Sequence, residues 1–372
     1  MVIKTDERRS MAELERSLDR GYTLPAEWYT SAEFYEQEKK RIFGRFWQYA
    51  GHLGQVAKVG DFFTCTLGDV PVVVVRDQEG ELRAFANVCR HRGSTLVLED
   101  HGSRKTIQCH YHGWTWNLDG TLRTAPRWNE SDYDKDDFPL HALKLETWGP
   151  MIFVNPDRSA GPLSTILGEL PQILAGTGLQ MDPLRHYERR TYDIAANWKI
   201  VAENFNECYH CPVAHPTFSD LIDIDTYKVV TEYEWFSTQH GAVREEARDG
   251  RVYDVSDDIL KAGVKEGCFS LIFPTTMLAT NPGPHNLLVL SMFPVDAHRT
   301  IEHFDFFFTE GVADAEVRPI IEFVEQVQQE DIILCESVQR GMRSGFFDQG
   351  RLMVSRENGI QHFQKLVYRV MA

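Results

Sequence analysis

Hydrophobic and polar positions follow three successive patterns along the chain, and each pattern predicts a different kind of structure. Residues 1–47 are polar and charged, and they end in an amphipathic helical stretch, SAEFYEQEKKRIFGRFW. Ser31 is placed to cap that helix, and Phe34 and Phe43 would pack inward. Short β-rich runs such as PVVVVRD and MIFVNPD then alternate with Gly and Asp turn signals. We therefore expect an N-terminal helical segment and then a small antiparallel β domain over residues 48–155.

The third pattern begins after a linker, NPDRSAGPLS, that is rich in Pro, Gly and Ser. ILGELPQIL and the segment after Ala195 have helical patterns, and strands return over residues 228–310 with KVVTEYEWF, NLLVLSMFPV and TIEHFDFFFTE. A long helix is expected over residues 314–341, and ENGIQHFQKLVYRVM predicts a closing helix. The apolar positions of the long helix recur at helical spacing: Val317, Ile320, Ile321, Val324 and Val327. Residues 156–372 should thus form a second domain of strands and helices.

Composition narrows the class of protein. The 372 residues exceed the length at which one hydrophobic core usually stops growing, which agrees with two domains. A net charge of −16 repels phosphate backbones, so nucleic acid is not an expected partner. No apolar run reaches the roughly 18 residues that a membrane helix needs, and the charged N-terminus does not resemble a signal peptide. Seven cysteines, sparse and odd in number, argue against a disulfide scaffold and fit a reducing cytoplasm.

Four potential metal ligands occur as two similar pairs, in CRHRGS at 89–94 and CHYHGWTW at 109–116. The first pair is Cys89 with His91, and the second is Cys109 with His112. Two thiolates on one iron and two neutral imidazoles on the other form a Rieske [2Fe–2S] cluster. A structural zinc site is the alternative, although zinc more often uses C-x2–4-C with H-x3–5-H. His110 does not match a ligand position, and we expect it to be a surface residue.

A second candidate site lies in ANWKIVAENFNECYHCPVAHPTFSD at 196–220. His210 and His215 would diverge by about 140° on one unbroken helix. Pro212 would bend or end that helix and let His215 return beside His210. Two imidazoles and one carboxylate make the facial triad of non-haem Fe(II) oxygenases, although H-x4-H alone is a weak signal. Glu207 lies three residues before His210, on the same face if the segment is helical.

Cys208 and Cys211 form a C-x2-C pair beside these histidines. A zinc-binding or redox pair is one interpretation of that spacing. We favour the other interpretation, in which both are core cysteines on the helix that carries the ligands, because cysteines are often buried.

The two sets of ligands, together with Gly93, Gly113 and Trp114, strongly resemble the Rieske non-haem iron oxygenases, the ring-hydroxylating and related enzymes. The resemblance implies an α+β fold, in which an antiparallel β Rieske domain is inserted near the N-terminus of a helix-grip-like catalytic domain. The catalytic domain would hold an antiparallel sheet flanked by helices. The implied cofactors are a Rieske [2Fe–2S] cluster and a mononuclear Fe(2+), with O2 as co-substrate.

The same resemblance assigns the remaining site residues. QQEDIILCESVQRGMRSG at 328–345 is similar to the segment that supplies the third iron ligand, which gives Asp331 that role and leaves Glu330 as the alternative. Glu330 would otherwise be a solvated charge of the helix. Glu207 would hydrogen-bond the iron histidine and reach the Rieske histidine of a neighbouring subunit in a homotrimer. Glu203, one turn earlier, is expected to be structural.

Glutamate rather than the commoner aspartate at position 207 resembles the quaternary-ammonium subgroup, the carnitine, betaine and choline monooxygenases. The segments ECYHCPVAHP, FPVDAHRTIEHFDFFFTE and ESVQRGMRSGFFDQGRL support this resemblance. It implies monooxygenation of a carbon next to a quaternary or tertiary amine, with C–N cleavage or N-demethylation. Two alternatives stay open: an aromatic-ring hydroxylating dioxygenase or demethylase of aromatic acids, and a Rieske electron carrier or zinc module without oxygenase activity.

A cationic substrate needs aromatic faces or carboxylates around it. The candidate contacts are Phe205, Tyr209 and Phe273, and Trp235 and Phe269 are also near in sequence. Phe273 lies in SLIFPTTML, where the carnitine enzymes carry extra Trp, and this departure argues against carnitine itself. The chain has no G-x-G-x-x-G after a strand, so NAD(P)H is expected to act only through a separate flavin and iron–sulfur reductase.

Overall fold

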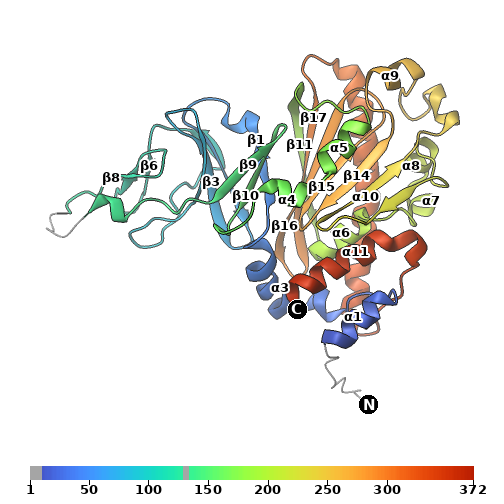
Figure 1. Ribbon diagram of the computed structural model, residues 1–372, viewed down its shortest axis with the longest axis horizontal. Coiled ribbons are helices and arrows are strands. Elements are labelled where there is room, and N and C mark those ends of the chain that lie inside the picture. Colours follow the sequence, from blue (N-terminus) through green and yellow to red (C-terminus); the bar gives the residue numbers. More distant parts are fainter. Residues whose placement is uncertain (1–10, 129–133) are drawn as a thin grey trace.

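The computed structural model describes residues 11–128 and 134–372, so the first ten residues of the predicted N-terminal helical segment lie outside it. Figure 1 shows two parts side by side. The β region, residues 48–155, extends away from the αβ region, which comprises residues 11–47 and 156–372. All sheets are antiparallel, and the predicted α+β class is confirmed. Within the described ranges, no helix is both long enough and apolar enough to cross a membrane.

Three small sheets build the β region, with strand orders β1-β10-β9, β4-β3-β2-β5 and β6-β7-β8. Their bounds are β1 Gln48–His52, β2 Asp61–Leu67, β3 Val70–Arg76, β4 Leu82–Ala86, β5 His101–Ser103, β6 Ile107–Gln108, β7 Thr115–Trp116, β8 Leu122–Thr124, β9 Lys144–Trp148 and β10 Met151–Asn155. The valine run of β3 is fully buried between its neighbours, as expected for a central strand. The sheet of β6, β7 and β8 forms the tip that lies farthest from the αβ region (Figure 1).

A seven-stranded sheet forms the core of the αβ region, with strand order β11-β17-β16-β15-β14-β13-β12. Its strands are β11 Leu184–Ile194, β12 Lys228–Val230, β13 Phe236–Gly241, β14 Gly267–Ile272, β15 Thr276–Thr280, β16 Asn286–Asp296 and β17 Arg299–Thr309. Successive side chains of a strand point to opposite faces. Phe304, Phe306 and Phe308 therefore pack in the core that α6, α10 and α11 cover, whereas Phe307 packs in the core under α4 and α5.

Helices cover both faces of this sheet. The long predicted helix is α10, Asp314–Arg343, and the closing helix is α11, Val354–Met371. The others are α1 Met11–Asp19, α2 Glu27–Thr30, α3 Ala32–Glu38, α4 Leu163–Leu167, α5 Leu170–Gly176, α6 Trp198–Phe205, α7 Cys211–Ala214, α8 Pro216–Leu221 and α9 Asp257–Ala262, with short 3-10 or π turns at Lys39–Phe43, Leu53–Val56, Lys135–Asp137 and Glu245–Asp249. Ser31 caps α3 as predicted, since its Oγ accepts a hydrogen bond from the Phe34 N–H at 3.2 Å.

Two segments of the large sheet differ from the prediction. The sequence pattern does not predict β11, because this edge strand carries Arg185, Glu188 and Arg190 in place of a regular apolar alternation. KVVTEYEWF is not one strand either: β12 ends at Val230, and β13 begins at Phe236.

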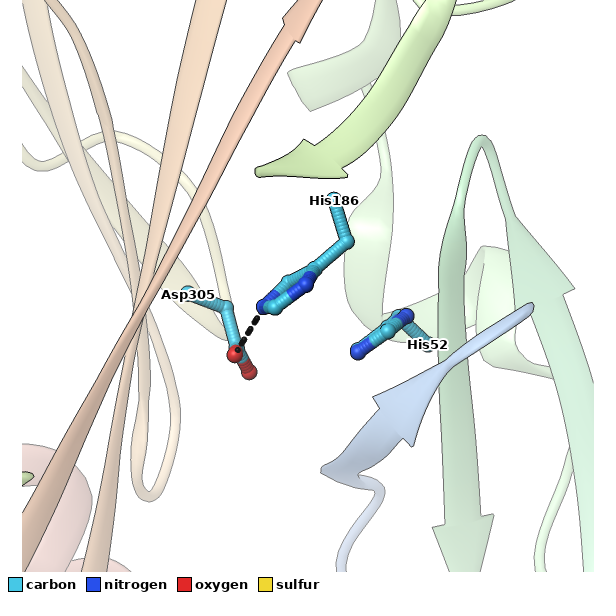
Figure 2. A group of neighbouring side chains, drawn as sticks. All are labelled: His52, His186 and Asp305. Atoms are coloured by element: carbon cyan, nitrogen blue, oxygen red, sulfur yellow. Dashed lines mark hydrogen bonds and ion pairs between the residues drawn. The ribbon is translucent and has the colours of Figure 1, made fainter. Parts of the chain in front are cut away.

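A buried ion-pair network joins the β region to the large sheet. Asp305 on β17 accepts two hydrogen bonds from the Arg189 guanidinium, at 2.8 and 2.6 Å, and one from the Tyr49 hydroxyl of β1 at 2.8 Å. His186 contacts the same carboxylate at 2.9 Å and stacks on His52, with ring centroids 4.0 Å apart (Figure 2). Although these two histidines and Asp305 lie close enough to ligate a metal, the guanidinium already neutralises the carboxylate and would repel a divalent cation. We therefore assign the cluster to the joining of the two parts.

Candidate metal centres and substrate cavity

Two loops of the β region share one conformation and present the four predicted cluster ligands. In each loop the N–H of the cysteine, Cys89 or Cys109, donates to the carbonyl five residues later at 2.8 Å. A glycine four residues after the cysteine donates back to the cysteine carbonyl at 3.0 Å. These glycines, Gly93 and Gly113, have φ of 74° and 73°, a conformation that disfavours other residues. The repeated turn explains why both loops carry the same Cys, His and Gly order.

The cysteines of these loops are buried, and the histidines face solvent. Cys89 is 4% exposed and Cys109 is 1% exposed, and burial raises the pKa of the Cys89 thiol. His91 and His112 are exposed, with ring centroids 4.6 Å apart. The two loops thus place the Cys89 and Cys109 thiols beside each other and the His91 and His112 rings beside each other, in the two pairs that a Rieske cluster requires. His110 is exposed, as predicted for a surface residue.

The segment with the second pair of histidines is less helical than predicted. After α6 the chain runs without helix through Glu207 to His210, and the single turn of α7 separates His210 from His215. Pro212 lies in the first turn of α7, where its missing N–H costs nothing. Two predictions are therefore wrong: Pro212 does not end a helix that carries His210, and Glu207 does not lie on a helical face. The histidines still meet, because one helical turn returns the chain to the same side.

The three predicted iron ligands converge on one point. His210 Nε2 lies 3.1 Å from His215 Nε2, and Asp331 Oδ1 lies 2.9 Å from His215 Nε2 and 3.5 Å from His210 Nε2. Ligand atoms about 2.1 Å from one ion, at right angles to one another, lie about 3 Å apart. The spacing of these two imidazoles and one carboxylate therefore fits a divalent metal ion bound on one face, with the other positions open.

Neighbouring carboxylates set the tautomer of both histidines. Glu207 accepts a hydrogen bond from His210 Nδ1, and Glu330 Oε2 lies 2.7 Å from His215 Nδ1. Because a carboxylate only accepts, each Nδ1 carries a proton, and Nε2 is the ring nitrogen left to bind a metal. The expectation that Glu330 is a solvated helix charge is wrong, because it holds His215 in position.

Asn204 and Glu203 make polar contacts near the site, and no sequence motif predicts these contacts. Asn204 Nδ2 donates to Asp331 Oδ1 at 3.0 Å and holds the carboxylate in place. Glu203, on the same helix, accepts from the Tyr29 hydroxyl at 2.6 Å and the Gln364 amide at 3.1 Å, so it packs between helices as expected. Asn204 is the last residue but one of α6, close before the ligand segment, and that placement is the one signal that could have indicated its role.

The electrostatics of the site favour a cation between the three ligands. Burial alone would lower the pKa of His210, but hydrogen bonds with Asp331 and Glu207 raise it to about 10. The same histidines hold the pKa of the Asp331 carboxyl below its usual value against the effect of burial. Positive charge at the Nε2 atoms, whether a proton or a metal ion, is therefore strongly stabilised.

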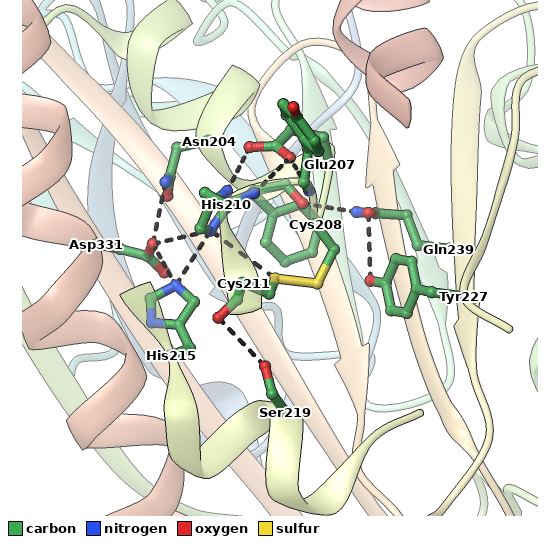
Figure 3. The surroundings of a disulfide bond; sticks show 12 residues. Asn204, Glu207, Cys208, His210, Cys211, His215, Ser219, Tyr227, Gln239 and Asp331 are labelled. Atoms are coloured by element: carbon green, nitrogen blue, oxygen red, sulfur yellow. Dashed lines mark hydrogen bonds and ion pairs between the residues drawn. A yellow bond between two sulfur atoms is a disulfide. The ribbon is translucent and has the colours of Figure 1, made fainter. Parts of the chain in front are cut away.

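Cys208 and Cys211 are joined by a disulfide, with their Cα atoms 5.0 Å apart (Figure 3). The bond closes a four-residue loop that contains His210, and Cys211 Sγ lies 4.0 Å from His210 Nε2. The prediction that both cysteines are core residues is confirmed, but the prediction that they lie on one ligand-bearing helix is wrong. The cysteines are buried, but Cys208 precedes α7, and both sulfurs are bonded.

A cavity of about 100 Å³ lies against the three predicted iron ligands. Besides Glu207 and Asp331, one further carboxylate lines it, that of Glu302. None of the lysine or arginine side chains in the described parts of the chain reaches its wall. The rest of the wall is largely apolar, and it includes five phenylalanines: Phe205, Phe218, Phe269, Phe304 and Phe323.

Only one of the three aromatic residues predicted to contact substrate lies at this cavity. Phe205 lines it. Tyr209 is 53% exposed and faces a separate surface hollow beside Lys228. Phe273 is fully buried and packs edge-on against Phe46, with ring centroids 5.0 Å apart. Of the three, only Phe205 therefore remains a predicted substrate contact. Phenylalanines of β14, β17, α8 and α10 also line the cavity.

Comparison with known proteins identifies the class. Residues 46–144 match the Rieske [2Fe-2S] domain, and residues 181–372, slightly more than half the chain, match the ring hydroxylating alpha subunit (catalytic domain). The chain belongs to this family of Rieske oxygenases, which confirms the resemblance inferred from the motifs. Family membership makes it an oxidoreductase with a Rieske [2Fe–2S] cluster and a mononuclear iron that works with O2.

Proteins similar over most of the chain are named monooxygenases of carnitine, choline or quaternary ammonium compounds. The carnitine monooxygenase oxygenase subunit of Acinetobacter pittii is 33% identical over 358 residues, 94% of this chain and 95% of that protein. The chloroplastic choline monooxygenase of Arabidopsis thaliana is 33% identical over 370 residues, 94% of this chain and 83% of that protein. The crystal structure of the quaternary ammonium Rieske monooxygenase CntA in complex with L-carnitine superposes with a TM-score of 0.81 at 31% identity, covering 96% of this chain and 97% of that chain.

Proposed function

We propose that this chain is the oxygenase component of a two-component Rieske monooxygenase that oxidises a carbon next to a quaternary or tertiary amine. Electrons would come from NAD(P)H through a separate flavin and iron–sulfur reductase. Oxidation at that carbon leads to C–N cleavage or N-demethylation. The observation that carries the proposal is the cavity beside the iron ligands, whose wall combines phenylalanine rings and carboxylates with no lining lysine or arginine among the described residues.

The ligand assignment is part of this proposal. The proposed cluster ligands are Cys89, His91, Cys109 and His112. The proposed iron ligands are His210 and His215 through Nε2 and Asp331 through its carboxylate. The donor set fits, since two neutral imidazoles and one carboxylate suit non-haem iron. When bound, the iron supplies O2 activation, and the cluster supplies single electrons.

The cavity is suited to a compact cationic group. Aromatic faces attract an ammonium group, and this attraction strengthens when water is excluded. Phenylalanine, valine and leucine side chains make the wall largely apolar in the cavity that the ligands His210 and His215 also line. A carbon attached to the nitrogen would thus be held against the open face of the iron ligands.

We further propose that the functional unit is a homotrimer in which electrons pass between subunits. Figure 1 places the cluster-binding tip at the opposite end of the molecule from α7 and α10. His91 and His112 are exposed at that tip, while Glu207 hydrogen-bonds the iron-side His210. Glu207 is thus available to link His210 to a Rieske histidine of a neighbouring subunit. A solved structure of the similar enzyme CntA is described as revealing inter-subunit electron transfer.

A substrate panel tests the activity. Holoenzyme with a surrogate reductase, NADH and O2 is incubated with choline, glycine betaine and carnitine, and with aromatic acids. Mass spectrometry then measures oxidised or dealkylated product. We expect product from at least one ammonium compound and none in the His210→Ala variant. Turnover of aromatic acids alone would instead favour a ring hydroxylase or demethylase, and oxygen consumption without product would not count as activity.

A further inference from the structure

Glu302 is an acidic residue in an otherwise apolar part of the cavity wall. It lies on β17 in the alternation that places Phe304, Phe306 and Phe308 against the helices, so its side chain points to the same face. The residue is 1% exposed, and it lines the cavity together with Gln328. A charged residue in the middle of an apolar strand face is rare, because burial of a carboxylate is costly.

The Glu302 carboxylate has few partners of its own. Gln328 Nε2 donates to Glu302 Oε2 at 2.7 Å, and this is the one hydrogen bond to the carboxylate within residues 11–128 and 134–372. Burial raises the pKa of Glu302 to about 8, and the nearby negative charge of Asp331 acts in the same direction. The carboxylate therefore lacks the compensation that a buried negative charge needs.

Two other buried acids of the described chain differ from Glu302 in having a cation beside them. Glu38 binds Lys199 at 2.6 Å, and Asp305 binds Arg189 at 2.6 Å. Glu302 has no such partner in the described chain, and it is one of the residues that line the cavity. The natural partner for this carboxylate is thus a cation that enters the cavity.

We propose that Glu302 is the counter-charge that anchors the ammonium group of the substrate and thereby determines specificity for cations. This inference rests on the proposed function. Glu302 and Asp331 line one cavity of about 100 Å³, so a small ligand in it lies close to both. An ammonium group held by Glu302 would direct its attached carbons towards the iron ligands. Glu302 would act by binding and orienting the substrate, with the phenylalanine rings enclosing its methyl groups.

The test compares cations with neutral isosteres. Calorimetry measures binding of choline and of 3,3-dimethylbutan-1-ol, which has carbon in place of nitrogen, to the full-length holoenzyme. Glycine betaine and 3,3-dimethylbutanoate form a second pair. The variants are Glu302→Gln and, as the matched control, Glu310→Gln, which removes the same charge from an exposed residue at the end of the same sheet. Thermal unfolding and the Rieske EPR signal verify that each variant is intact.

We expect the wild type and Glu310→Gln to bind at least one cation about tenfold or more tightly than its isostere, and Glu302→Gln to lose that preference. Affinity for the isostere should stay unchanged, and Glu302→Asp should restore part of the preference, which a merely structural residue would not do. If Glu302→Gln does not fold, Glu302→Met removes the charge with a flexible side chain of similar length.

The outcomes separate the two proposals. Retention of the cation preference in the intact Glu302 variants overturns the role of Glu302 and leaves the proposed function standing. A wild type that binds both members of each pair equally well contradicts the proposed function, and the role of Glu302 falls with it.

Discussion

Two glutamates determine which ring nitrogen of each histidine at the proposed iron site can bind a metal. Glu207 and Glu330 accept from the Nδ1 atoms of His210 and His215 and leave the Nε2 atoms facing Asp331. The sequence could single out the two histidines and Asp331 as candidate ligands, because the segments that carry them resemble the motifs of a known family. It could not reveal the contact of Glu330, because that contact exists only where α10 meets the turn after α7. A sequence motif can reveal candidate metal ligands, but the hydrogen-bond partners of those ligands depend on how the helices and turns pack together.

The role of Glu330 leads to a prediction about metal affinity. Glu330→Gln keeps the shape of the side chain but weakens the hydrogen bond that it accepts from His215 Nδ1. We expect metal affinity at the mononuclear site to fall about 10–100-fold, the usual cost of losing such a partner. Iron content after dialysis against graded chelator measures the change, and excess iron should restore turnover. Glu322→Gln, an exposed position on the same helix, is the control. Equal iron retention in both variants would contradict this role.

At the scale of elements, predictability follows the regularity of the pattern. Helix α10 was predicted almost to its ends, and an apolar stripe from Val317 to Val327 marks its first half. Edge strand β11 has no such signal, because its charged side chains face solvent or pair with Arg299 of β17 and Arg318 of α10. The segment from Glu207 to His215 looks helical in sequence, yet side-chain hydrogen bonds and the Cys208–Cys211 bond hold it as a turn.

The disulfide in this segment gives a second prediction. It closes a short loop around His210, and a loop of this size contributes about 2 kcal/mol to the free energy of unfolding in the chain-entropy view. The double variant Cys208→Ser with Cys211→Ser should therefore unfold at lower temperature and lose iron more readily than the control Cys65→Ser. Alkylation followed by mass spectrometry shows which thiols are bonded in the wild type. Two freely alkylated cysteines at 208 and 211, or unchanged stability of the double variant, would refute this contribution.

For the whole molecule, the contact between the β region and the large sheet makes stability depend on pH. Burial, with a smaller effect of His186, lowers the pKa of His52 from its usual 6.5 to about 3. Below pH 6.5, His52 binds a proton in the unfolded chain but stays neutral in the folded protein. This contribution to stability is thus complete above pH 6.5 and is lost as the pH falls towards 3, by at most about 1.4 kcal/mol per pH unit.

We therefore expect the thermal midpoint of His52→Gln to fall less than that of the wild type when the pH is lowered from 7 to 5. His110→Gln, at an exposed position of the β region, should follow the wild type. Differential scanning calorimetry across this range measures the slopes. Parallel slopes for all three proteins would show that His52 does not couple the junction to pH.

The assembly gives a prediction of its own. If electrons pass between subunits, two inactive variants should complement each other: His91→Ala, without a functional cluster, and His210→Ala, without the mononuclear iron. Mixed oligomers, purified through two different tags, should regain turnover that neither parent shows. The added change Glu207→Gln in the His91→Ala chain should abolish it again. Mixed oligomers as inactive as their parents would exclude transfer between subunits.

The most direct test of the central claim is a single turnover without any reductase. Chemically reduced holoenzyme is mixed with O2 and the ammonium compound that the substrate panel selects, and product is quantified for the wild type and for Asp331→Ala. The account predicts oxidation beside the nitrogen by the wild type. Asp331→Ala should form no product but keep the Rieske EPR signal of the wild type. Equal product from both proteins, or no product from the wild type, would contradict it.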